Sequence, residues 1–205
     1  MVNVLKYIVL ASNSPRRIEL LKKLGVELII ISPNIEEVKY VDDPFKTVLE
    51  NSKRKVLNVV DKAPQKSIII GVDTVVFHPL IGVVSKPKTT EEAKIMLNTF
   101  SGRAHMVVGG VTLFDKESGK RIEFTDITIV KFKNLTEEEI DLYLKIENPF
   151  DKAGGYAIQG LACFFIDTII GDYYNVLGLP LSKLYDVLNK EFGLNLLKNF
   201  VAKEL

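Results

Sequence analysis

The stretch LASNSPRR, residues 10–17, brings together side chains suited to binding an anion. Ser12, Ser14, Arg16 and Arg17 stand where an apolar strand, expected at Tyr7–Ala11, gives way to a helix. The first turn of a helix has free backbone N–H groups and the positive end of the helix dipole, so added cations are unfavourable there without an anionic partner. Arginine offers paired donors that match phosphate oxygens. The stretch therefore predicts a phosphate site; a capped helix with two solvated arginines is the alternative.

Carboxylates that could work beside such a site follow two other expected strands. Asp73 comes after the strand expected at Ser67–Ile70, in IIIGVDTVV, where α/β proteins place functional groups. It could accept a proton from water or hold a hard cation, or simply cap backbone N–H groups in a turn. Glu36 and Glu37 follow a strand expected at Glu27–Ser32, and one of them could share a cation with Asp73.

Two lysines and a glycine-rich loop complete the candidate residues. Lys53 lies on the basic face of a helix expected at Thr47–Val60, and Lys86 precedes a proline in VVSKPK. Gln159 lies in DKAGGYAIQG, whose glycines let the backbone turn sharply or approach a ligand closely. Its amide has one acceptor and two donors, which suits the reading of a nucleobase edge. Solvated lysines and a purely structural loop are the alternatives.

The elements that position these residues alternate between helix and strand at first, and the middle of the chain has an antiparallel pattern. Thr89 with Glu92, and Thr136 with Glu139, have the spacing of capping boxes that begin helices. Further strands are expected at Ala104–Phe114, Ile122–Phe132 and Ala162–Ile170, and a last helix from about Leu181. This order predicts an α/β protein with a mixed sheet and helices packed around it, in a single domain over residues 1–205.

Composition excludes several classes of function. The 205 residues carry a formal net charge of +1, which gives no overall field for nucleic acid or membrane binding. The single cysteine, Cys163, excludes an intramolecular disulfide and a cysteine zinc cluster, and two histidines cannot build a multi-histidine metal site. Any metal is therefore expected to be a hard cation on carboxylates. With no signal-peptide pattern and no membrane span, a cytoplasmic protein is expected.

Seven segments together resemble the Maf family of nucleotide pyrophosphatases, once named septum formation inhibitors. They are LASNSPRRIELL, IEE, GVDTVV, SKP, FSGRAHMVVGGV, DKAGGYAIQG and GDYYNVLGLPLSKL, in the family's order from about residue 8 to 188. The resemblance implies a fold related to inosine triphosphate pyrophosphatases, in which an elongated mixed sheet with flanking helices forms two lobes around a nucleotide cleft. It also implies hydrolysis of a nucleoside triphosphate to the monophosphate and pyrophosphate, with Mg²⁺ or Mn²⁺.

Roles for individual residues follow from the same resemblance. Asp73 resembles the family's catalytic proton acceptor. Glu36 and Asp73 together resemble the carboxylates that the family uses to bind the metal ion. The implied phosphate-handling residues are Ser12, Arg16, Arg17, Lys53 and Lys86, and we expect both arginines to be directed at the same phosphates. The run ENSKRK departs from the family's usual residues around Lys53.

Three positions bear on the choice of nucleotide. Arg16, Thr74 and Gln159 all resemble the branch that acts on dTTP and UTP, whereas the branch that acts on 7-methyl-GTP tends to have Trp, Gln and Glu there. Uracil and thymine present an N3–H donor between two carbonyl acceptors, and an amide can pair with both kinds of group. Modified pyrimidine nucleotides stay open as substrates. A nucleotide-binding regulator of cell division with little catalysis is the alternative function, and a homodimer stays open because the family often forms dimers.

Overall fold

The computed structural model describes residues 6–23 and 25–198. Its sheet has the strand order β2-β1-β3-β5-β6-β7, with β4 paired to β3 outside this path. The strands are β1 Tyr7–Ala11, β2 Leu28–Ile30, β3 Ser67–His78, β4 Gly82–Val84, β5 Ala104–Asp115, β6 Arg121–Phe132 and β7 Ile166–Ile170. The α-helices are α1 Pro15–Lys23, α2 Pro44–Val59, α3 Thr90–Phe100, α4 Glu137–Ile146, α5 Tyr173–Val176 and α6 Leu181–Phe192.

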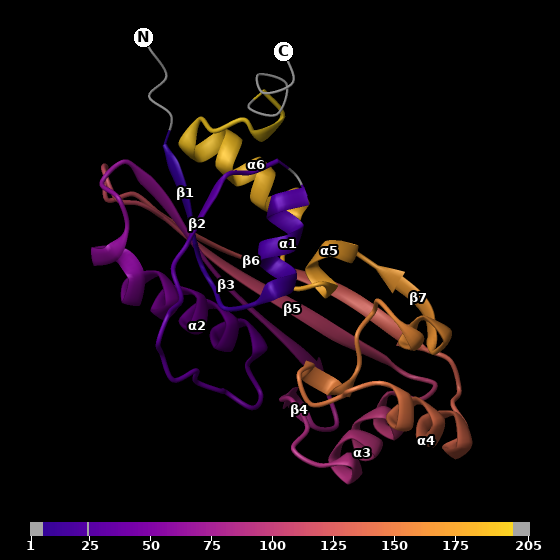
Figure 1. Cartoon of the computed structure of the whole chain (residues 1–205). Helices are drawn as coiled ribbons and strands as arrows, with labels where there is room; N and C mark the ends of the chain where they lie inside the picture. The colour runs from indigo at the N-terminus through magenta and orange to yellow at the C-terminus, as the bar shows by residue number, and fades with distance from the viewer. Residues whose placement is uncertain (1–5, 24, 199–205) are drawn as a thin grey trace.

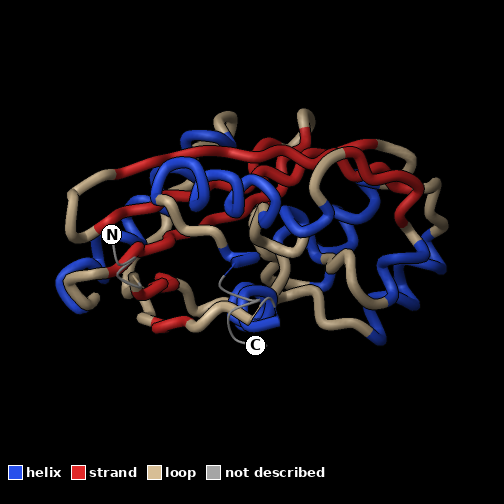
Figure 2. The backbone as a smooth tube through the Cα atoms, turned by 90° about the horizontal axis from the view of Figure 1, so that it is seen from above, coloured by secondary structure: helices blue, strands red, loops and turns tan. Residues whose placement is uncertain are grey.

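The expected mixed sheet is confirmed. Strand β1 pairs in parallel with both β2 and β3, and every other pairing in the described sheet is antiparallel. Parallel strands need a crossover that covers the sheet, and the chain supplies it with α1 and α2. Figure 2 shows the strands as one long layer that runs across the molecule.

Strand β3 lies in the middle of the sheet, and its side chains pack into three different hydrophobic cores. Ile68 and Ile70 pack into a core with residues of α1 and α6, whereas Ile69 faces a second core with residues of α2. Further along, Val76 belongs to a third core with residues of α3 and α4. One strand therefore runs through all three cores and joins the two ends of the molecule.

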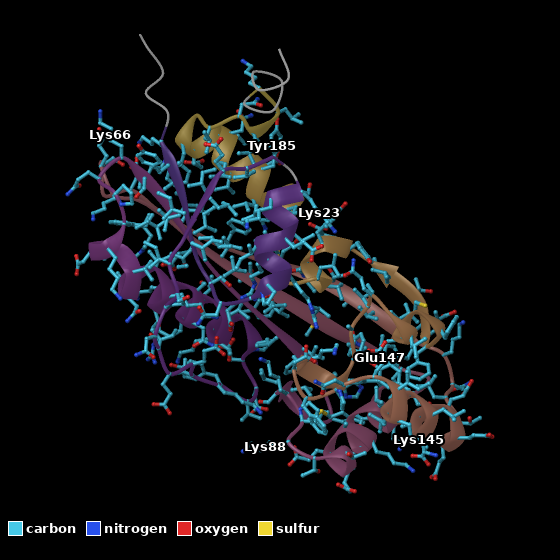
Figure 3. The ribbon with its side chains drawn as sticks, viewed as in Figure 1. Lys23, Lys66, Lys88, Lys145, Glu147 and Tyr185 are labelled. Carbon is cyan, nitrogen blue, oxygen red and sulfur yellow. The ribbon has the colours of Figure 1, made fainter. Side chains whose placement is uncertain are left out.

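Four of the helices lie toward opposite ends of this long sheet, which gives the molecule two lobes (Figure 1). Helices α1 and α6 lie at one end, where Figure 3 labels Lys23 and Tyr185. Helices α3 and α4 lie at the other end, where it labels Lys88 and Lys145. Among the described residues, no helix combines the length and apolarity needed to span a bilayer.

Helix α2 and strand β7 begin at other residues than the sequence predicts, and β3 continues to His78 instead of ending at Ile70. Helix α2 begins at Pro44 rather than Thr47, because Asp43 caps the helix with its side chain and proline suits the first helical position. Strand β7 begins at Ile166 rather than Ala162, because the preceding residues form a 3-10 turn. The capping box expected at Thr136 is confirmed.

Helix α2 lies unusually close to the sheet because two glycines face it. A Cβ atom at Gly71 of β3 would lie 2.2 Å from the backbone oxygen of Ser52, and one at Gly110 of β5 would lie 2.6 Å from the Val48 side chain. Contacts this short are not tolerated by real side chains. The two glycines therefore set the distance at which α2 presents its residues to β3.

We expect Gly110→Ala to push α2 away from the sheet. Overpacking of this kind costs about 1–3 kcal/mol of unfolding free energy, measurable by urea denaturation. The same shift should lower any activity that depends on α2 residues.

Gly119→Ala is the control for the added methyl group. Its φ of +73° makes alanine unfavourable, by about 1 kcal/mol, but no atom lies within 4 Å of the added Cβ. Activity should therefore be unchanged in this variant. A Gly110→Ala protein as stable and as active as the wild type would contradict the role of Gly110.

Candidate active site

A cavity of about 920 Å³ lies between the two lobes, beside an unpaired edge of β3. Strand β1 ends with Ala11 opposite Gly71, and β4 begins its pairing only opposite Val76. Over residues 72–75, β3 therefore has no strand partner on that side within the described part of the chain. Side chains from both faces of β3 can reach the cavity around this open edge.

Asp73 points from β3 toward α2, where two donors hold its carboxylate. Lys55 Nζ donates to Oδ1 at 2.8 Å, and Asn51 Nδ2 donates to Oδ2 at 2.9 Å. Lys55 also contacts Glu37 Oε1 at 2.6 Å and donates to the carbonyl of Val72 at 3.1 Å. The side chains of Asp73 and Lys55 are both only 7% exposed. A buried charge is tolerated when it is paired and hydrogen-bonded, so each group here satisfies the other.

Thr74 points to the opposite face of β3, toward α1. Arg17 donates from Nη2 to Thr74 Oγ1 at 3.0 Å and from Nε to the Gly178 carbonyl at 2.7 Å. Burial lowers the pKa of Arg17 below its ordinary value, against the attraction of Asp73 and Glu37. Arg17 therefore ties α1 to β3 and to the loop that follows α5.

Arg16 is held far more loosely than its neighbour. Its Nη2 lies 3.5 Å from Asp151 Oδ2 across the cavity, and the two side chains are 40% and 57% exposed. An exposed ion pair at that distance contributes little to stability, so Arg16 can exchange this partner for another anion. Next to it, buried Ser12 accepts a hydrogen bond from the Ser14 N–H at 3.1 Å and fixes the turn that enters α1.

The glycine-rich loop is anchored by a buried contact at Tyr156 and by a partly buried contact just after its last residue. Tyr156 hydrogen-bonds through its hydroxyl to His105 Nε2 at 2.6 Å, and the His105 ring stacks on Phe100 with centroids 4.3 Å apart. At the far end, the N–H of Leu161 donates to Oε1 of Glu147, at 3.2 Å; Figure 3 labels Glu147. Between these anchors the exposed side chain of Gln159 lines the cavity.

Most of the residues singled out from the sequence lie on this cavity. Its walls include Ser12, Ser14, Arg16, Arg17, Asp73, Thr74, Lys86 and Gln159. Asp73 lies within β3 rather than after a strand, because β3 continues to His78. Arg17 is directed at Thr74 and Gly178, not alongside Arg16.

Glu36 and Lys53 do not line the cavity, whereas Glu37 and Lys55 do. Glu36 lines a separate shallow hollow on the outer side of α2. The sequence held a signal for Lys55, since the buried stripe of α2 recurs every three or four residues and includes position 55 but not 53. The segment around Glu37 has no helix or strand period, so its orientation could not be derived in that way.

Similar proteins were found for nearly the whole chain. The sequence model described as Maf-like protein matches residues 7–191. A relative from Staphylothermus marinus, named dTTP/UTP pyrophosphatase, is 50% identical over 98% of this chain and 97% of its own. A relative with the same name from Alkaliphilus metalliredigens is 43% identical over 93% of this chain and 98% of its own.

Among solved structures, a HAM1 protein from Coxiella burnetii aligns with a TM-score of 0.44 and 17% sequence identity. The alignment covers 62% of this chain and 73% of the HAM1 chain.

The buried pair of His105 and Tyr156 predicts a pH dependence of stability. Burial, with a smaller contribution from His78, lowers the pKa of His105 to about 3. The unfolded chain takes up this proton near pH 6.5 and the folded protein only near pH 3, so stability falls as the pH drops through that range, by up to about 1.4 kcal/mol per pH unit.

We expect His105→Phe to reduce this dependence, as measured by urea denaturation at pH 7, 5.5 and 4. Phenylalanine keeps the stacking on Phe100 but does not titrate. Equal losses of stability in the two proteins between pH 7 and 4 would contradict the assignment of a buried neutral histidine.

Proposed function

The chain belongs to the Maf-like protein family, and from this premise we propose that it hydrolyses dTTP and UTP to the nucleoside monophosphate and pyrophosphate. The observation that carries the proposal is the buried carboxylate of Asp73, which Lys55 and Asn51 hold at the edge of a cleft. The names of the two relatives, which match this chain over nearly their whole length, support it.

The α1 side of the cleft receives the triphosphate. The first turn of α1 offers backbone N–H groups, and Arg16 exchanges its weak contact with Asp151 for a paired contact to phosphate oxygens. Lys86 follows β4 on the opposite wall, where Pro87 stiffens the backbone. Positive charge on both walls offsets the charge that develops on the phosphoryl oxygens in the transition state.

Asp73 accepts the proton of the attacking water. Its two oxygens each have one donor from α2, which fixes the plane of the carboxylate and leaves a lone pair for the proton. As the water oxygen bonds to phosphorus, the α–β anhydride bond breaks and pyrophosphate leaves. The ammonium of Lys55 balances the charge of the carboxylate before the proton is transferred, and Glu37 remains its counter-charge once Asp73 is protonated.

Glu37 and Asp73 are the carboxylates that would hold Mg²⁺ or Mn²⁺. No group of three or more metal-ligating side chains occurs among the described residues, so the protein alone offers an incomplete set. Mg²⁺ commonly takes one or two carboxylates and completes its shell with water and substrate phosphates, so these two side chains fit it when the triphosphate is bound. The ion then supplies charge stabilisation to the phosphates. Glu37 takes the role that the resemblance implied for Glu36.

Gln159 reads the pyrimidine from the glycine-rich loop. Its exposed amide lines the cleft, and the anchors at Tyr156 and Leu161 limit how far the loop can shift. Modified pyrimidine nucleotides fit the same chemistry when the change leaves the edge of the base intact.

The first test measures pyrophosphate and orthophosphate release from dTTP, UTP, CTP, ATP, GTP and 7-methyl-GTP with Mg²⁺, and again with EDTA. We expect pyrophosphate from dTTP and UTP and none with EDTA. Asp73→Asn should lower turnover by about 10²–10⁴-fold, since it removes the proton acceptor, while nucleotide binding persists in calorimetry.

The alternative, a nucleotide-binding regulator of cell division, predicts a different result. Such a protein would bind nucleotides without releasing pyrophosphate, and Asp73→Asn would leave its cellular effect intact. If pyrophosphate were released from 7-methyl-GTP alone, the proposed type of reaction would stand, but the assignment of a pyrimidine as the nucleobase would be wrong.

A matched pair of lysine variants tests which lysine of α2 serves the site. Lys55→Met leaves Asp73 buried without its counter-charge, so we expect a loss of about 3–5 kcal/mol in unfolding free energy together with a loss of turnover. Lys53→Met should change stability by less than about 0.5 kcal/mol and keep turnover. Similar effects of the two substitutions would contradict the assignment to Lys55.

A further inference from the structure

Arg17, Thr74 and Gly178 form a closed group of hydrogen bonds on the cleft wall. Arg17 donates to the Thr74 hydroxyl at 3.0 Å and to the Gly178 carbonyl at 2.7 Å, and the hydroxyl lies 3.2 Å from the same carbonyl. The Arg17 side chain also packs on the Gly178 Cα, where an added Cβ would lie 3.6 Å from Arg17 Nε. With a φ of +110°, residue 178 has a backbone conformation that favours glycine.

The direction of every proton in this group is determined by chemistry. A guanidinium has only donors and a carbonyl only an acceptor, so while both contacts hold, the Thr74 hydroxyl accepts from Arg17 and gives its one proton to Gly178. A hydroxyl has one proton and two lone pairs. After these two bonds, one lone pair is left, and toward the cleft Thr74 can act only as an acceptor.

We propose that Arg17 is a positioning residue for base selection, which fixes the Thr74 hydroxyl as an acceptor for the N3–H of uracil or thymine. This inference rests on the proposed function. Cytosine has an unprotonated N3, so at the same place it presents an acceptor to an acceptor. Without Arg17 and Gly178 the hydroxyl could rotate and donate to that nitrogen, and the selection against cytosine would be lost.

The placement of Arg17 supports this role over a purely phosphate-binding one. Two of its five N–H donors are bound within the protein, and its guanidinium lies against Gly178. Arg16, one residue earlier, has only a long contact to an exposed carboxylate. The two arginines thus serve different parts of the substrate.

The experiment compares kcat/KM for UTP and CTP in the full-length protein and its variants. We expect Thr74→Val, which removes the hydroxyl, to lower the preference for UTP by about tenfold. Arg17→Met, which removes the donors but keeps the apolar stem, should lower the ratio by a similar factor. The double variant should lose no more than either single one, because both break the same contact.

Conservative variants and a neighbour serve as controls. Thr74→Ser keeps the hydroxyl and should keep the UTP preference. Arg17→Lys retains a cation that can reach only part of the group, so its ratio should lie between the wild type and Arg17→Met; it also covers a failure of Arg17→Met to fold, as checked by thermal unfolding. Arg16→Met should weaken the inhibition by inorganic tripolyphosphate. Although the resemblance counted Arg16 among the positions that bear on the choice of nucleotide, we expect this variant to change the UTP to CTP ratio by less than Arg17→Met does.

Several outcomes separate this inference from the proposed function. If Arg17→Met and Arg17→Lys lower turnover of UTP and CTP equally, Arg17 acts on the phosphates and the inference is overturned. A wild type that does not distinguish UTP from CTP overturns it as well, although hydrolysis stands. If the wild type releases no pyrophosphate from any nucleotide, the proposed function itself fails.

Discussion

The buried ion pair between Asp73 and Lys55 is the interaction on which the rest of the site depends. A carboxylate that is 7% exposed needs donors from a rigid element, and α2 supplies them only because it lies close to the sheet. Gly71 and Gly110 permit that approach by leaving room where side chains would collide. One glycine in β3 and one in β5 are therefore required for α2 to hold the Asp73 carboxylate in place.

The open edge of β3 explains how one strand can serve two chemical tasks. Successive residues of a strand point to opposite faces, so Asp73 and Thr74 would normally be separated by the sheet. Between the residues that pair with β1 and those that pair with β4, however, both can reach the same cleft. The proton acceptor thus lies on the α2 face of β3, and the hydroxyl proposed for base selection lies on its α1 face. Within the residues described, the two lobes meet at residues 72–75, the stretch of β3 that has no strand partner on one side.

Local patterns predicted those features of the fold that depend on neighbours in sequence. The caps of α3 and α4, the strand Tyr7–Ala11 and the hairpin of β5 and β6 all follow from nearby residues, and the structure contains them. Motif spacing likewise selected most of the residues that line the cleft. The sequence could not predict which way a side chain points in a segment without helix or strand. Glu36 and Glu37 lie in such a segment, where a shift of one residue changes the surface that a side chain faces. For Lys55, the helical period alone would have placed the side chain on the buried face of α2, whereas the family motif led to the prediction of Lys53.

The two adjacent arginines show why residue types alone do not assign tasks. Neighbouring positions on a helix point about 100° apart, so Arg16 and Arg17 cannot both project in one direction from α1. Arg16 faces the open cavity and Asp151, whereas Arg17 turns to Thr74 and Gly178. A cation at the start of a helix is unfavourable unless something compensates it. For Arg17 the protein itself supplies that compensation through a carbonyl and a hydroxyl, with the charges of Asp73 and Glu37 nearby. For Arg16 the protein supplies only a weak partner, which leaves its charge available to the anion that the cleft is built to receive.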